Sequence, residues 1–142
     1  MLNIEFVLHD KELDNFTKQT IIRICELVNT KLELPNTIQV EYKRLSDSTY
    51  GELSLHSKFR NRVVINSILE THELITPLIH ELIHVHQIHT GQLDIRRDSV
   101  YIWNKRTYHV ENNMSYKQYL ELPWETDVTE KLKLISKFIL EQ

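Results

Sequence analysis

The first residues of the chain alternate apolar and polar side chains, and the period of the pattern then lengthens. Leu2 to Leu8, with the sequence LNIEFVL, has the two-residue period of a strand or an extended lead-in. From Asp10 to about Leu32 the apolar residues recur at steps of three and four, and Asp10 is placed to cap the start. The pattern therefore predicts one strand followed by an amphipathic helix.

Three short β-like runs follow the break at Pro35-Asn36. They cover Thr37–Tyr42, Thr49–His56 and Arg62–Ile65, with polar residues between them. Because the connections are short and polar, we expect the three runs to form a small antiparallel sheet.

The second half of the chain is predicted to be mainly helical. Ile68–Ile75 suits a single helical turn, and Thr76-Pro77 then supplies the N-cap and first position of a new helix. This helix is expected to run to about His89, with Gly91 placed to end it. The remaining expected elements are a hairpin and two helices, at Val100–Trp103, Thr107–Glu111, Ser115–Leu120 and Glu125–Leu140.

Composition narrows the class of protein. A chain of 142 residues that is 41% hydrophobic and 26% charged suits one globular domain, and no stretch rich in Gly, Pro or Ser suggests a linker. We therefore expect residues 1–142 to form a single domain. No stretch approaches about 18 consecutive apolar residues, and the N-terminus lacks the basic region of a signal peptide. We expect a monomeric cytoplasmic protein that does not enter a membrane.

Four histidines lie close together in the sequence HELIHVHQIH. The segment His80 to His84 matches HExxH, and on a helix two residues four apart share one face, so both imidazoles can reach one metal ion. Zinc with three protein ligands keeps an open position for water, which would place Glu81 beside that water rather than on the metal. The alternative is that His80 and His84 are ordinary residues of a polar helix face.

Other histidines nearby are not expected to contribute. On a helix His86 and His89 are rotated from His84 by roughly 200° and 140°, so neither faces the same ion. The segment His72–Ile75 repeats the letters HELI, but it lacks the second histidine, and Pro77 is expected to break any helix that continues from it.

A third metal ligand must come from another part of the chain. Gln87 and Thr90 stand where the metzincin pattern requires its glycine and its third histidine. The downstream candidates are Asp94, Asp98, His109, Glu111, Glu121, Glu125, Asp127 and Glu130. Glu125 has the best setting, because Pro123 starts the last helix and a glutamate in its first turn can point inward.

Three segments together resemble a known class of protein. HELIHVHQ, YIWNKRTYHVE and MSYKQYLELPWETDV resemble the small HExxH metallopeptidase-like proteins of bacteriophage and bacterial genomes, which are minimal gluzincin-type domains with the signature HExxHxxQ … W … Y … Y … LPWExEA. The resemblance covers approximately residues 70–130. It implies that Glu125, in the PWE motif, is the third zinc ligand. It also implies a zincin-like α+β domain with an N-terminal helix, a small twisted and mostly antiparallel sheet, an HExxH active-site helix and C-terminal helices.

The chain departs from this pattern at two places. Asn104-Lys105 stands where the family often has a glycine after the tryptophan, and Asp127-Val128 replaces Glu-Ala. Asp127 could orient a ligand histidine, or bind the metal in place of Glu125. In zincins an edge strand binds substrate by strand addition, and by chain order Tyr50–Leu55 is the expected edge strand. Gly51 would then admit another backbone, unless it merely ends a turn.

The leading interpretation is a zinc-dependent peptidase that acts on a peptide or protein substrate. His80, His84 and Glu125 would hold Zn²⁺, and Glu81 would act as general base toward a metal-activated water. Tyr108 is the favoured donor to the oxyanion of the transition state. The other candidates for that role are His109, Tyr116 and Tyr119.

Two other functions fit part of the pattern. One is a metal-stabilised phage accessory or structural protein without turnover. The other is a DNA-associated protease resembling the SprT-like group, which also carries HExxH. A net charge of −3 and the lack of a CxxC ribbon argue against it, and nucleic acid is not expected as a partner.

Overall fold

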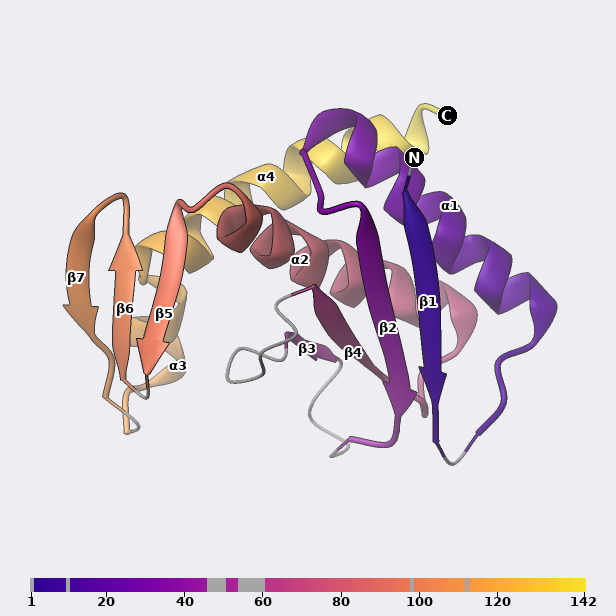
Figure 1. The fold of residues 1–142 in the computed structure, drawn as a ribbon, viewed down its shortest axis with the longest axis horizontal. Coiled ribbons are helices and arrows are strands. Elements are labelled where there is room, and N and C mark those ends of the chain that lie inside the picture. Colours follow the sequence, from indigo (N-terminus) through magenta and orange to yellow (C-terminus); the bar gives the residue numbers. More distant parts are fainter. Residues whose placement is uncertain (1, 10, 46–50, 54–60, 98, 112) are drawn as a thin grey trace.

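Two sheets and four helices make up the described part of the chain. The computed structural model describes residues 2–9, 11–45, 51–53, 61–97, 99–111 and 113–142 (Figure 1). In chain order the elements are β1 (Asn3–Leu8), α1 (Asn15–Lys31), β2 (Thr37–Lys43), β3 (Gly51–Leu53), β4 (Arg62–Asn66), α2 (Thr71–His89), β5 (Leu93–Arg97), β6 (Val100–Trp103), β7 (Arg106–His109), α3 (Tyr116–Leu120) and α4 (Pro123–Leu140). The fold is of the α+β class, as expected.

The larger sheet has the order β1-β2-β4-β3. Strands β1 and β2 are parallel, β2 and β4 are parallel, and only β3 runs antiparallel to its neighbour β4. The antiparallel sheet expected of the three runs is therefore wrong for β2 and β4, which pair in parallel, and right for β3 and β4. The physical reason is the connection, because β3 lies at the edge beyond β4, so the chain between β2 and β4 is a long crossover of the kind that joins parallel strands. The strand–helix–strand unit of β1, α1 and β2 adds a second parallel pair. The described part of the predicted edge strand, Gly51–Leu53, does lie at the edge, whereas Tyr50, Ser54 and Leu55 lie outside the described residues.

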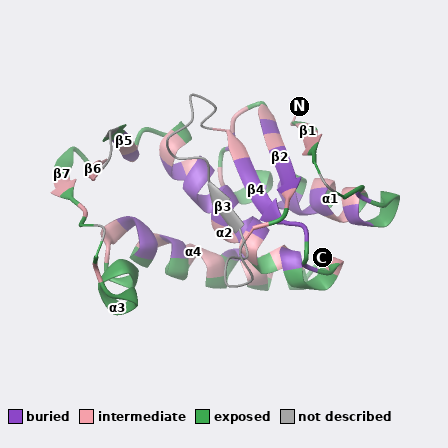
Figure 2. Ribbon diagram, turned by 90° about the horizontal axis from the view of Figure 1, so that it is seen from below, coloured by how far each residue is buried: buried purple, intermediate pink, exposed green. Residues whose placement is uncertain are grey.

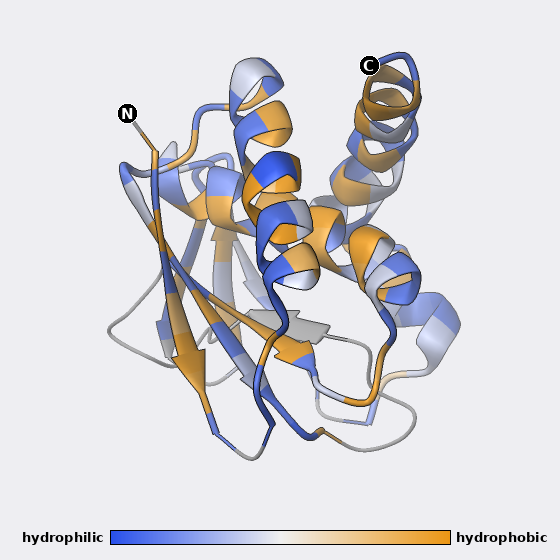
Figure 3. Ribbon diagram, turned by 90° about the vertical axis from the view of Figure 1, so that its right-hand side faces the viewer, coloured by the Kyte–Doolittle hydropathy of each residue, from blue (hydrophilic) through white to orange (hydrophobic). Residues whose placement is uncertain are grey.

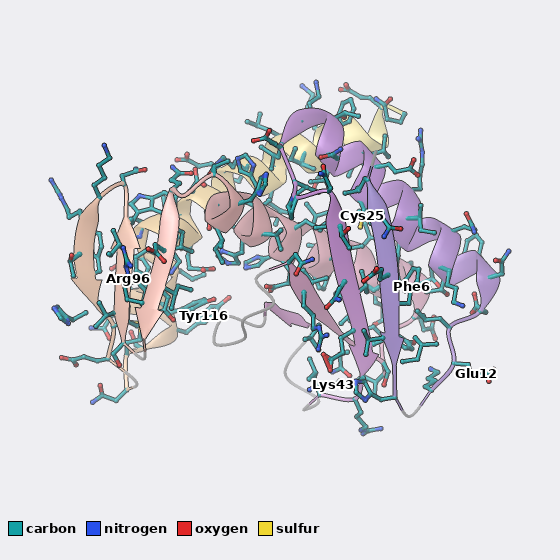
Figure 4. The ribbon with its side chains drawn as sticks, viewed as in Figure 1. Phe6, Glu12, Cys25, Lys43, Arg96 and Tyr116 are labelled. Carbon is teal, nitrogen blue, oxygen red and sulfur yellow. The ribbon has the colours of Figure 1, made fainter. Side chains whose placement is uncertain are left out.

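Helix α1 begins later than the sequence pattern suggested. Asp14 is its N-cap and accepts a hydrogen bond of 2.7 Å from the Thr17 backbone N–H. The expected cap, Asp10, lies outside the described residues. The inward face of α1 carries Cys25, which is fully buried in the main core and can be located in Figure 4.

Helix α2 begins earlier than expected and contains Pro77 in its interior. Its N-cap is Glu70, which forms a capping box with Glu73, so the predicted start at Thr76-Pro77 is wrong. An internal proline removes one helical hydrogen bond. Leu74 and Leu78, on either side of it, are both fully buried, and their packing offsets that loss. The helix ends as predicted, with Gly91 at a φ of 79° just beyond it.

Helix α2 lies at the centre of the main core. Figure 3 shows the helices on one side of the larger sheet, and Figure 2 shows that the buried residues concentrate along α2 and the strands beside it. Helix α4 packs against α2 on the side away from the sheet. The largest fully buried side chains of α2 are Leu74, Leu78, Ile79, Leu82, Ile83 and Gln87. None of the helices in the described ranges is long and apolar enough to cross a membrane.

The second sheet is an antiparallel meander of β5, β6 and β7. The sequence predicted the β6–β7 hairpin and missed β5. Asn104 and Lys105, which stand after Trp103 where the resemblance led us to expect a glycine, join β6 to β7 with φ angles of 48° and 69°. Two consecutive positive φ angles define the type I′ turn that suits a two-residue hairpin loop. The turn thus forms without glycine.

A smaller core joins this meander to the start of α4. Trp124 stacks against Tyr101 with ring centroids 4.8 Å apart, and Trp103 and Tyr108 also pack against it. Leu93 and Ile95 of β5 complete this core. The first turn of α4 is therefore held by the second sheet. The position of Glu125, which follows Trp124 in the sequence, depends on that packing.

Candidate metal centre

Three potential metal ligands from two helices converge at one place. His80 and His84 lie on α2, and Glu125 lies in the first turn of α4. The His84 Nε2 atom is 2.9 Å from one carboxylate oxygen of Glu125, and the His80 Nε2 atom is 3.4 Å from the other. One ligand atom from each residue lies within 4.8 Å of the other two. The three residues proposed from the sequence as ligands are thus brought together.

The helix period explains why the two histidines face the same way. His80 and His84 are one turn apart, and their ring centroids are separated by 5.1 Å. Ile79 and Ile83, which neighbour them in sequence, are buried in the main core and fix the rotation of α2. The His80 side chain is 32% exposed, whereas that of His84 is only 8% exposed. Solvent therefore reaches the site from the side of His80.

Glu125 is held in place by its neighbours in sequence. Pro123 occupies the start of α4, and Trp124 and Val128 are both buried, one in each core. Their packing turns the Glu125 side chain inward, where the residue is only 3% exposed. This agrees with the predicted setting of a first-turn glutamate flanked by core residues.

The electrostatics of the site follow from these short distances. Burial alone would raise the pKa of Glu125, but the close approach of the His80 and His84 rings lowers that pKa to about 2. Burial opposes protonation of His84, but the carboxylates of Glu125 and Glu81 overcome it, so the pKa of His84 is raised. Without a metal ion, the site holds a buried ion pair between Glu125 and His84.

The residues present could hold a metal ion. The Oε1 atom of Glu125 is buried and has no hydrogen-bond partner among the described residues, which is unusual for a buried carboxylate oxygen. Ligand atoms about 2.05 Å from a tetrahedral zinc ion lie about 3.3 Å from one another. The 3.4 Å between His80 Nε2 and Glu125 Oε1 is close to that value. Two imidazoles and one carboxylate are also a donor set that zinc accepts while keeping an open position.

Glu81 lies between the two histidines in sequence and is 8% exposed. Its negative charge reaches His84, whose pKa it helps to raise. It is not a member of the group whose ligand atoms converge. This placement, beside the site but outside the ligand set, is the one that the general-base prediction requires.

The structure separates the tyrosine candidates. The Tyr108 ring packs edge-on against Trp124, with centroids 5.6 Å apart, in the smaller core. Tyr119 of α3, which is 40% exposed, is close enough to the site to feel its charges. Partial burial raises the pKa of its phenol, and the negative charges of Glu125 and Glu81 raise that pKa further. Tyr116, labelled in Figure 4, stacks on Tyr119 at a centroid distance of 6.5 Å. The role predicted for Tyr108 remains a prediction, and the electrostatic interaction of Tyr119 with Glu125 and Glu81 makes Tyr119 a second candidate for it.

A buried hydrogen-bond network supports His84 from behind. The Nδ1 atom of His84 is 2.8 Å from the Gln87 Oε1 atom. The Gln87 Nε2 group donates to the Trp124 carbonyl oxygen at 3.0 Å and to the Asp127 carboxylate at 2.9 Å. Lys131 lies 2.8 Å from the same carboxylate. We call these five residues the Gln87 network.

Sequence reasoning missed the role of Gln87. It was considered only as a mismatch to the metzincin pattern, although the signature HExxHxxQ contains it and it follows His84 by three residues on one helix face. Asp127 was considered as a ligand or as a direct partner of a histidine, whereas it contacts Gln87.

The remaining histidines of the cluster face elsewhere, as predicted. The His86 Nδ1 atom is 2.8 Å from the Glu33 carbonyl oxygen, and His89 lies 3.9 Å from the Glu33 carboxylate. Another group that could hold a metal, Glu70 with His72 and Glu73, is exposed, and such exposed acidic groups are common without any ion.

Comparisons with protein-family models, curated proteins and solved structures find no match to this chain. The class of protein therefore rests on its own fold and site, an α+β chain in which two helices form a candidate metal centre.

The ion pair at the site predicts how stability of the metal-free protein depends on pH. Glu125 has a lowered pKa, so its contribution to the free energy of unfolding increases as pH rises from about 2 to 4.5 and is complete above pH 4.5. His84 has a raised pKa, so its contribution is complete below 6.5 and is lost at higher pH. Relative to Glu125→Gln, the wild type should gain stability on the order of 3 kcal/mol between these two limits.

Urea unfolding of both proteins in the presence of a chelator, at a series of pH values, measures this difference. A difference between wild type and Glu125→Gln that stays constant from pH 2 to pH 8 would contradict the assigned ion pair.

Proposed function

We propose that this chain is a zinc-dependent peptidase with His80, His84 and Glu125 as metal ligands and Glu81 as general base. The observation that carries the proposal is the convergence of the three ligand atoms beside a fourth residue, Glu81, that stays outside the ligand set. A structural metal site has its coordination filled by protein side chains, whereas three protein ligands leave a position open for chemistry.

The chemistry of the proposal divides between the ion and the chain. A bound zinc ion would polarise the carbonyl of the scissile peptide bond and make a water more acidic. Glu81 would take the proton of that water and pass it to the leaving amine. The burial of Glu81 keeps its carboxylate in a less polar environment than water, where its charge acts more strongly.

A peptide substrate is supported by the position of β3. This strand lies at the edge of the larger sheet and beside α2, the helix that carries Glu81. An extended peptide could pair with the β3 backbone as an added strand, and its scissile bond would then lie near α2. Strand pairing forms hydrogen bonds mainly with the peptide backbone and requires that backbone to be extended. We therefore propose unstructured peptide segments as the substrate class.

A second function is favoured by the ion pair itself. Glu125 already binds His84 without an ion and thereby joins α4 to α2. A metal ion at this place would strengthen the same connection, as in a metal-stabilised accessory or structural protein without turnover. The two functions differ in whether Glu81 matters.

Replacing Glu81 by Gln should slow hydrolysis strongly and retain zinc. We expect a fall in kcat of about 10²- to 10⁴-fold on a mixture of fluorogenic peptides, because the amide cannot accept the proton. The matched control is Glu73→Gln, an exposed glutamate in the HELI repeat of the same helix, which should leave the rate unchanged. Zinc content is measured on all three proteins.

If wild type and Glu81→Gln both bind zinc and neither hydrolyses any peptide above the metal-free background, the function without turnover is favoured. Hydrolysis by Glu81→Gln at the wild-type rate would remove Glu81 from the mechanism.

The contacts of the two tyrosines predict different effects on catalysis. Tyr119→Phe should lower kcat by about 10²-fold, because its phenol interacts with the charges of the site and can donate to the developing oxyanion. Tyr108→Phe keeps the ring that packs on Trp124 and should change kcat less than threefold by rough estimate. Steady-state kinetics with the same peptides measures both, and the reverse order of effects would restore Tyr108 as the donor.

A further inference from the structure

We infer that Gln87 is a positioning residue that holds two of the three proposed ligands, His84 through its ring and Glu125 through the preceding backbone carbonyl. The inference rests on the proposed metal centre and assigns to Gln87 and Asp127 a part that the ligand set alone does not contain.

The orientation of the Gln87 amide is fixed by its partners. The Trp124 carbonyl oxygen and the Asp127 carboxylate can only accept hydrogen bonds, and both lie beside the same atom of Gln87. That atom must therefore be the amide nitrogen. The amide oxygen then faces the Nδ1 atom of His84, and it can only accept.

The orientation of Gln87 in turn determines the state of the His84 ring. Because the Gln87 oxygen accepts, His84 must carry a proton on Nδ1. The other ring nitrogen, Nε2, points toward Glu125 and is the atom available to a metal ion. Gln87 thus selects the form of the imidazole that the proposed site needs.

Burial makes this arrangement costly to change. Gln87 is fully buried between α2 and α4. Turning its amide around would place an oxygen against two acceptors and leave the His84 Nδ1 proton facing a donor, with the loss of three hydrogen bonds away from water. Lys131 adds a fixed charge on the outer side of Asp127 and holds that carboxylate toward Gln87.

The network also connects the two helices at the site. The Trp124 carbonyl belongs to the residue before Glu125, so the Gln87 side chain fixes the backbone from which the third ligand projects. Asp127 therefore acts on the centre through Gln87 rather than as a ligand or as a direct partner of a histidine.

A reversal of the hydrogen-bond polarity tests the network. Gln87→Glu places a carboxylate against the Asp127 carboxylate and the Trp124 carbonyl, and should weaken zinc binding about 10- to 100-fold. Asp127→Asn should weaken zinc binding less than Gln87→Glu does, because the side-chain oxygen at position 127 can still accept a hydrogen bond from Gln87. In the double variant the new amide at position 127 can donate to the new carboxylate at position 87, which still accepts from His84. The double variant should therefore bind zinc more tightly than Gln87→Glu alone.

Competition with a chromophoric chelator measures zinc affinity of the four proteins, and thermal unfolding of their metal-free forms measures the same coupling without zinc. Gln87→Met, of similar volume, separates packing from hydrogen bonding and should also lose affinity. Asp94→Asn, at a carboxylate paired with Arg96 outside the network, should have no effect. In the zinc-loaded wild type, ¹⁵N NMR of the His84 ring should show the proton on Nδ1.

Two results would overturn the inference. One is a double variant no better than Gln87→Glu in both zinc affinity and melting temperature, and the other is wild-type affinity in Gln87→Met. Failure of the proposed function has a different signature. If the wild type binds no zinc, but the metal-free double variant melts at a higher temperature than Gln87→Glu, the network is supported and the metal centre is rejected.

Discussion

A buried carboxylate between two imidazoles is the interaction on which the arrangement of this protein depends. Glu125 is almost fully removed from solvent, and a buried negative charge is strongly unfavourable unless it is paired. Its partners, His80 and His84, lie on another helix. The rest of the structure keeps those two helices in register. A shift of either helix would leave the charge of Glu125 uncompensated.

Each helix is held by its own core. Helix α2 is fixed by the main core, in which the larger sheet and α1 bury its apolar face. The first turn of α4 is fixed by the smaller core, where Tyr101 and Trp103 of the second sheet pack on Trp124. Gln87 then connects the two halves by hydrogen bonds across the interface between the helices. The candidate centre thus lies where the two cores meet, which explains how a small chain can place three ligands with little freedom.

The sequence was informative where local periodicity decides the structure. The spacing of His80 and His84, the first-turn position of Glu125 and the end of α2 at Gly91 all depend on helix geometry, and the structure agrees with each. Whether the three side chains bind a metal stays a prediction. The parallel pairing of β2 with β4 was missed because the three short strands were paired by proximity along the chain, whereas β3 lies at the edge beyond β4.

The other differences have a tertiary origin. Pro77 was taken as a helix start because proline is unfavourable inside helices, but the burial of the residues beside it keeps α2 continuous. The contact between Gln87 and Asp127, and the approach of Tyr119 to the carboxylates, join residues on different helices. No periodicity in one chain predicts such contacts, because they depend on how the helices pack.

The metal content of three purified proteins tests the central claim most directly. The wild type, Glu125→Ala and Asp127→Ala are each exposed to zinc, passed over a desalting column and analysed by mass spectrometry for bound metal. The account predicts stoichiometric zinc in the wild type, retention in Asp127→Ala at saturating zinc, and loss in Glu125→Ala, since of these two carboxylates only Glu125 belongs to the converging group. Stoichiometric zinc in Glu125→Ala together with its loss in Asp127→Ala would contradict the account.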